Sequence, residues 1–337
     1  MKLTAVLLSL IFLFSCSNDP KAPDVSHIKV NVPIERFDKS FFSLDTNNLS
    51  SGLRELMKTY PDFYVDFMQQ ILGVPGSDTN QVTLDVCKRF IRGYFPIYRE
   101  LNEKYNDAGV IQKDLQNGLR YVRHYFPEYK TGKAILFVGP LDAPGVALTQ
   151  SGIAIGLHQF GGKDFPAYKS MEAQQLFPEY ISRRFEPQYI PANCMKAVAD
   201  EIYPDKTAGK GLIEQMIEKG KQWWLLDKFL PTTPDSIKTG YSEQQLEWCE
   251  ANEGLIWNEI ITTQRDLYTK DPMALQNYIG EAPFTQSMSP ASPGNIGQWV
   301  GWQIVKKFAE KNSSMDVTDI LKTDPGKIFE GAKYKPK

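Results

Sequence analysis

The chain has few of the residues on which most catalytic sites depend. Its 337 residues include three histidines, His27, His124 and His158, and none lies in a His-Glu-x-x-His sequence. Gly-x-Ser-x-Gly, Cys-x-x-Cys and the phosphate-binding Gly-x-x-x-x-Gly-Lys-Ser/Thr sequence are also absent. These absences argue against the common zinc peptidases, serine hydrolases, thiol oxidoreductases and nucleotide-binding enzymes.

The chain is nearly neutral, with 38 lysines and arginines and 40 aspartates and glutamates. The sequence contains no block of like charges. We therefore expect no nucleic-acid partner and no polybasic membrane patch. The only long apolar run is residues 3–14, about 12 residues, whereas a membrane-spanning helix needs roughly 20. The run predicts an export signal and not a membrane span.

That run follows Lys2 and ends in Leu13-Phe-Ser-Cys16, which is typical of a bacterial lipoprotein signal. We predict a signal peptide over residues 1–15, a lipidated tether over 16–26 and a folded body over 27–337. Acyl chains on Cys16 would anchor the protein, at about 0.8 kcal/mol per buried methylene. We expect a cell-envelope protein with its body in the periplasm or at the cell surface. The alternative is an ordinary cleaved signal peptide, because Phe14 is large for its position.

The three remaining cysteines, Cys87, Cys194 and Cys249, each fall on the apolar stripe of a predicted helix. A free cysteine in such a place behaves as a small hydrophobic residue. We expect three buried thiols; one disulfide, or a reactive role, stays open as an alternative.

The apolar periodicity changes along the chain and predicts an α+β fold, a mainly helical single domain with one small β-sheet. A first strand is expected over residues 27–32. Helices are predicted at 49–60, 61–72, 81–105 with an interruption at Pro96, and 111–126. Three strands of the sheet are predicted at 134–138, 145–149 and 153–157. Beyond Met171 the chain is expected to be helical, with a capping box at 242–245 before a helix to about 265, another helix from 272, and a third over 294–310.

Several segments in a fixed order resemble one family, the gliding-motility lipoproteins of Bacteroidetes known as GldB. The resemblance covers essentially the whole chain. The matching segments are Ile34-Glu-Arg-Phe-Asp38, residues 184–196, residues 212–220, Gly240-Tyr-Ser242 with Trp248, residues 297–305 and residues 328–336. The resemblance implies a role in gliding over surfaces and in the secretion machinery coupled to it, with no defined activity.

The middle of the chain is also similar to a distant group of predicted zinc peptidases, which carry His-Glu-x-x-His on one helix and a third ligand on the next. Two imidazoles at i and i+4 would hold zinc with an open fourth position. Here the corresponding helix contains Asn193, Cys194 and Lys196 and no histidine, so we expect a degenerate zincin-type scaffold without metal or other cofactor. Glu218 is either a remnant of the third ligand or a solvated glutamate paired with a lysine.

All six tryptophans lie in the C-terminal part, at positions 223, 224, 248, 257, 299 and 302. They form part of the core, or some of them line a groove for a peptide, a glycan or a protein partner. Together with Asn193, Cys194, Lys196 and Glu218, we consider Trp299 and Trp302 candidates for a vestigial cleft.

Our first hypothesis is a non-catalytic lipoprotein that assembles or stabilises the gliding and secretion apparatus through protein partners. The alternative is a module that binds a peptide or glycan in an inactive peptidase cleft. A third and weaker one is a hydrolase that uses His158 or acidic residues near Glu218. His158 follows the last predicted strand, where functional residues often lie, but we expect a hydrogen-bonded loop histidine there.

Gly297 and Gly301 lie one helical turn apart among large residues. Glycine inside a helix costs roughly 0.5–1 kcal/mol relative to alanine, so close approach of another backbone is expected to offset that loss. By resemblance to the peptidase scaffold, the neighbour should be the helix that carries Glu218.

Overall fold

The computed structural model describes residues 22–336, so Cys16 and the predicted signal peptide lie outside the described residues. The small sheet contains β1 (Ile34–Arg36), β2 (Lys133–Phe137), β3 (Val146–Thr149) and β4 (Gly152–Gly156), in the order β1-β2-β4-β3. The first three in this order are parallel, and the edge strand β3 runs antiparallel to β4. The three strands predicted over 134–157 are thereby confirmed, with small shifts at their ends.

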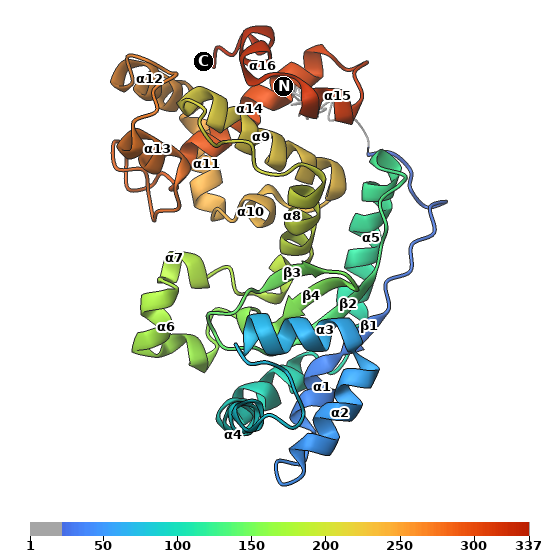
Figure 1. Cartoon of the computed structure of the whole chain (residues 1–337). Coiled ribbons are helices and arrows are strands. Elements are labelled where there is room, and N and C mark those ends of the chain that lie inside the picture. Colours follow the sequence, from blue (N-terminus) through green and yellow to red (C-terminus); the bar gives the residue numbers. More distant parts are fainter. Residues whose placement is uncertain (1–21, 337) are drawn as a thin grey trace, which may run out of the picture.

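Helices of the N-terminal half lie mostly below and beside the sheet in Figure 1. They are α1 (Phe37–Phe42), α2 (Leu49–Thr59), α3 (Pro61–Asp66) with a π-helical extension (Phe67–Ile71), α4 (Gln81–Lys104) and α5 (Gly109–Tyr125). Phe137 of β2 packs on Phe63 and Phe67, with ring centroids 5.5 and 6.2 Å away. This aromatic contact joins the sheet to α3 and its extension.

Helices of the C-terminal half include a cluster on the other side of the sheet, which α8 connects to it (Figure 1). They are α6 (Met171–Leu176), α7 (Glu179–Ser182), α8 (Ile190–Ile202), α9 (Leu212–Phe229), α10 (Asp235–Thr239), α11 (Glu243–Ala251), α12 (Glu253–Thr263), α13 (Pro272–Ile279), α14 (Ile296–Lys311), α15 (Val317–Lys322) and α16 (Pro325–Ala332). Short 3₁₀ helices lie at Leu157–Gln159, Pro166–Lys169 and Pro187–Tyr189.

One contiguous hydrophobic core extends from Val30 to Tyr334. The predicted α+β class, mainly helical with one small sheet, is confirmed. Cys87, Cys194 and Cys249 are free and buried, as expected. Burial raises the pKa of Cys87 to about 12, so this thiol stays protonated at neutral pH. Among residues 22–336, no helix combines the length and the apolar character that crossing a bilayer requires.

The strand predicted over residues 27–32 is wrong. Val30 and Val32 are buried, so the alternation of burial is real, but the segment pairs with no strand. Instead it runs along α5, whose side chains supply hydrogen bonds: Gln112 donates to the Val32 carbonyl and Arg123 to the Lys29 carbonyl. Alternation predicts an extended segment with one buried side, and it does not specify what satisfies the backbone.

Two expected helix boundaries also differ. The helix α4 continues through Pro96, which is exposed, so water can reach the Arg92 carbonyl that loses its helical donor. The helix predicted from 246 to about 265 is two helices that meet at Asn252, whose side chain donates to the Trp248 carbonyl and ends the first of them. The capping box of Ser242 and Gln245 is confirmed.

The predicted packing of the helix with Gly297 and Gly301 on the helix with Glu218 is confirmed. A β-carbon on Gly301 would overlap the Met216 carbonyl of α9, and one on Gly220 would overlap the Gly301 backbone. The two backbones therefore approach at a distance that only glycine allows. This contact fixes α14 against α9.

Candidate functional site

One face of α8 borders a cavity of ligand size. The opposite face carries Ile190, Cys194 and Val198, which are fully buried and hold the helix against the core. The cavity side carries Asn193, Lys196, Ala197 and Asp200, spaced three or four residues apart on one stripe of the helix. We call the space beside this stripe the α8 cleft.

The α8 cleft has a main lobe of about 370 Å³ and a smaller lobe of about 180 Å³. Arg184, Lys196 and Asp200 line both lobes, so the lobes adjoin each other. The remaining lining of the main lobe comes from residues 145–146, 159–160, 181, 185, 189 and 240. Its size lies within the range of roughly 300–1,000 Å³ that is usual for ligand pockets.

Two glycines shape the walls. A β-carbon on Gly145 would overlap the Gln159 side chain, whose amide nitrogen donates to the Ala143 carbonyl at 2.7 Å. Gly240 has a φ of +78°, and a β-carbon there would lie 2.8 Å from Cδ of Arg184. Because Gly240 adopts this left-handed conformation without a side chain, Arg184 can lie against the chain at the junction of the two lobes.

The charged groups of the cleft differ in their partners. Arg184 pairs with Glu281 at 3.2 Å, and Gln222 donates to the Asp200 carboxylate at 2.9 Å. Lys196 has neither a hydrogen bond nor an ion pair with any residue from 22 to 336. Burial, followed by repulsion from Arg184, lowers the pKa of Lys196 to about 8. The cleft thus contains a cation whose charge the described protein groups compensate incompletely.

Of the six residues predicted for a vestigial cleft, the structure brings together Asn193 and Lys196. Cys194 lies on the buried side of α8, where burial raises its pKa well above the ordinary value. Glu218 contacts Tyr203, Lys210 and Lys221 instead, and Trp299 and Trp302 are buried in the core on α14. The six residues therefore do not line one cleft.

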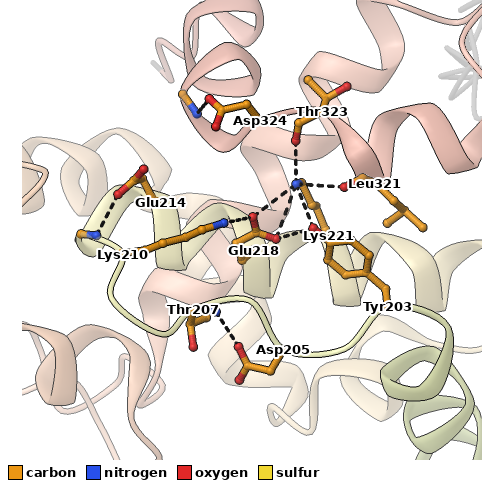
Figure 2. A network of polar contacts seen from close by, with 12 residues as sticks. Tyr203, Asp205, Thr207, Lys210, Glu214, Glu218, Lys221, Leu321, Thr323 and Asp324 are labelled. Carbon is orange, nitrogen blue, oxygen red and sulfur yellow. Dashed lines mark hydrogen bonds and ion pairs between the residues drawn. The ribbon is translucent and has the colours of Figure 1, made fainter.

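Glu218 lies at the centre of a buried polar network (Figure 2). It pairs with Lys210 and, at 3.5 Å, with Lys221, and it accepts a hydrogen bond of 2.5 Å from the Tyr203 hydroxyl. Lys221 also donates to the Leu321 carbonyl at 3.1 Å and to the Thr323 carbonyl at 2.8 Å. Pairing with a lysine was predicted correctly, but Glu218 is 3% exposed and not solvated.

The tryptophans are chiefly core residues. Trp299 and Trp302 are 2% and 1% exposed, and the Trp302 indole donates to Asp227 at 2.7 Å. Trp223 lines the smaller lobe of the α8 cleft while its ring packs edge-on against Trp302. A groove lined by several tryptophans is therefore not formed by these three.

His158 is fully buried behind the cleft wall. Its Nδ1 accepts a hydrogen bond from the Gly139 amide at 3.0 Å, and its Nε2 donates to the Ala143 carbonyl at 3.0 Å. Burial lowers the pKa of His158 to about 4, so the ring is neutral at pH 7. Because both ring nitrogens form hydrogen bonds, His158 holds the loop at Gly139 and Ala143 in place. Gln159 also donates to the Ala143 carbonyl.

Within the described range, no three His, Cys, Asp or Glu side chains are grouped so that they could hold a metal ion. Four further residues line the cleft without having been predicted from the sequence: Arg184, Gln159, Asp200 and Glu281. The sequence could have indicated Arg184, because the segment 184–196 that resembles the family contributes Arg184, Tyr189, Asn193 and Lys196 to the cleft lining.

The fold and the cleft define a mainly helical α+β protein with a polar cleft beside one helix of its middle region. Residues 18–336 match the family described as gliding motility protein GldB, and the chain belongs to that family. The comparisons find no significant match among curated proteins or solved structures.

Proposed function

We propose that this protein is a lipid-anchored, non-catalytic component that assembles or stabilises the gliding apparatus and the secretion machinery associated with it. Membership in the gliding motility family over residues 18–336 carries the proposal. The internal contacts of the groups considered for catalysis support it, because His158 and Glu218 both hold other parts of the chain in place. Lipidation at Cys16 would keep the body at the membrane.

The test is complementation of a deletion strain with the wild type and with Cys16→Ser. We expect Cys16→Ser to leave the precursor without acyl chains, to release it from the membrane fraction, and to abolish spreading of colonies and export of gliding-associated cargo. A variant that still carries acyl chains contradicts the predicted anchor. Normal spreading and export by a soluble variant contradict the need for it.

A second candidate function is binding of a peptide or glycan in the α8 cleft, with the body as an inactive peptidase-like scaffold. The specific observation in favour is Lys196, a cation in a cleft of ligand size without a partner among residues 22–336. This function is compatible with the first, because a bound segment of a partner is one way to assemble an apparatus. Lys196→Gln in the same complementation assay tests it: loss of gliding with normal protein levels is expected.

A further inference from the structure

The edge strand β3 has an open side, and its first residue, Val146, lines the α8 cleft. The Gly156 amide donates to the Gly145 carbonyl at 2.8 Å, and Ala147 lies opposite Ala154. Because antiparallel residues alternate between inward and outward hydrogen bonding, the backbone groups of Val146 and Leu148 point away from β4. No residue from 22 to 336 forms a hydrogen bond with these outward groups.

The open edge is also accessible. All four residues of β3 are partly exposed, and Val146 and Lys196 both line the main lobe. Proteins generally cover or blunt an unpaired strand edge, since it is a template for another strand. Extended peptides use such edges, with main-chain hydrogen bonds for affinity and adjacent pockets for selectivity.

Charge indicates what the pocket would select. Both carboxylates of the cleft already have partners: Glu281 pairs with Arg184 and Asp200 accepts from Gln222. The two carboxylates balance Arg184 and Lys196 in number and act on Lys196 at longer range, but Lys196 is the charged group of this lining that has no hydrogen-bond partner among residues 22–336. Moving a partly desolvated ammonium next to a carboxylate restores the interaction that it lost with water.

We propose that the α8 cleft binds an extended peptide segment, whose backbone pairs with Val146 and Leu148 of β3 and whose carboxylate pairs with Lys196. The inference rests on the proposed binding role of the cleft and specifies its ligand. A chain terminus and an acidic side chain supply the same carboxylate chemistry. A glycan lacks the regularly spaced N–H and C=O groups that a strand edge requires.

The first experiment passes three pools of random octapeptides over the immobilised mature protein in detergent. The first pool has free C-termini without Asp or Glu, the second has amidated termini with Asp and Glu, and the third has amidated termini without them. We expect the first or the second pool to be retained about tenfold better than the third. Which of the two is retained identifies the source of the carboxylate.

Two variants separate the contributions. Lys196→Gln should abolish the preference for carboxylates, whereas Lys113→Gln, on the exposed surface of α5, should preserve it. Val146→Pro removes an outward N–H but none that bonds to β4, so it should reduce retention of all pools several-fold. Thermal unfolding of each variant verifies that it is folded.

Equal retention of the three pools, or retention of none, overturns the proposal. So does retention of oligosaccharides that carry uronic acids when peptides are not held. The gliding assay distinguishes this failure from failure of the cleft as a site. If peptides do not bind but Lys196→Gln stops gliding, the cleft keeps its role and the ligand class is wrong; if Lys196→Gln glides normally, the binding role itself is wrong.

Discussion

Two lysines on neighbouring helices differ in burial and in surroundings: Lys221 is buried and Lys196 is half-buried. Lys221 on α9 is 1% exposed, and Glu218, the Tyr203 hydroxyl and two carbonyls surround its ammonium group. Lys196 on α8 lies in an open cleft and has no partner among residues 22–336. Burial lowers the pKa of both; Glu281 and Asp200 act on Lys196 only at longer range, whereas the groups around Lys221 contact it directly.

The comparison teaches how to separate a structural charge from a binding charge. A buried ion pair contributes little net stability but becomes costly when one partner is removed. The network around Lys221 therefore acts as a fixed attachment of the segment at Leu321 and Thr323 to α9. An unpaired cation in a cleft fixes nothing within the chain, and a ligand can compensate it.

The largest expected effect follows from Glu218→Gln. The amide keeps the shape of the side chain but leaves Lys221 as an unpaired buried charge, so we expect a loss of about 3–5 kcal/mol in the free energy of unfolding. Urea unfolding at pH 7 measures it. The double variant Glu218→Gln with Lys221→Met is the control and should regain part of the loss. A loss below about 1 kcal/mol would mean that water reaches the network.

The next effect concerns His158, a base that the fold keeps neutral behind the cleft. Its pKa is about 4 in the folded chain, against 6.5 when unfolded, so below pH 6.5 the unfolded state binds more protons. The contribution is complete above pH 6.5 and is lost as pH falls towards 4, by about 2–3 kcal/mol. Urea unfolding from pH 7 to 4.5 should show this slope for the wild type and a flatter one for His158→Gln. An unchanged slope in the variant would assign the pH dependence to other groups.

A smaller effect is expected at the glycine contact that closes α9 against α14. Gly301→Leu should lower the melting temperature most and Gly301→Ala less, with about 1–3 kcal/mol lost as the helices are forced apart. Gly93→Ala in α4 is the matched control, because a β-carbon there meets no atom within 4 Å. It should raise stability by about 0.5–1 kcal/mol through helix propensity. A raised melting temperature for Gly301→Leu would contradict the close contact.

The features of the fold that the sequence predicts are those set by local periodicity. Apolar patterns located the helices and the three strands at 134–157, and the glycines at 297 and 301 indicated a close helix contact. The segment 27–32 failed because its alternation is satisfied by side chains of α5, from residues 80 or more positions away. Such a partner cannot be deduced from a local pattern.

The candidate site was predicted less well for a related reason. Asn193 and Lys196 were found because the family-like segment contains them, but Gln159, Gly240 and Glu281 join the cleft only through the fold. Glu218 was misplaced because a helix has several faces, and its sequence neighbours do not tell which face meets α8 and which meets the chain at Leu321. The residue types indicated which side chains could bind a ligand, but which of them line the α8 cleft depends on tertiary packing.

The smallest expected effect on stability is that of Lys196→Met, and its contrast with Lys221→Met is the sharpest test of the comparison. Lys221→Met leaves Glu218 with Lys210 as its ion-pair partner and the carbonyls of Leu321 and Thr323 without a donor, so several kcal/mol should be lost. Lys196→Met removes no partner, so the free energy of unfolding should stay within about 0.5 kcal/mol or rise. Urea unfolding of both variants at pH 7, together with colony spreading, measures the contrast. A stable Lys196→Met protein that no longer supports gliding would assign Lys196 to binding, whereas a loss above about 1 kcal/mol would make it structural and remove the distinction between the two lysines.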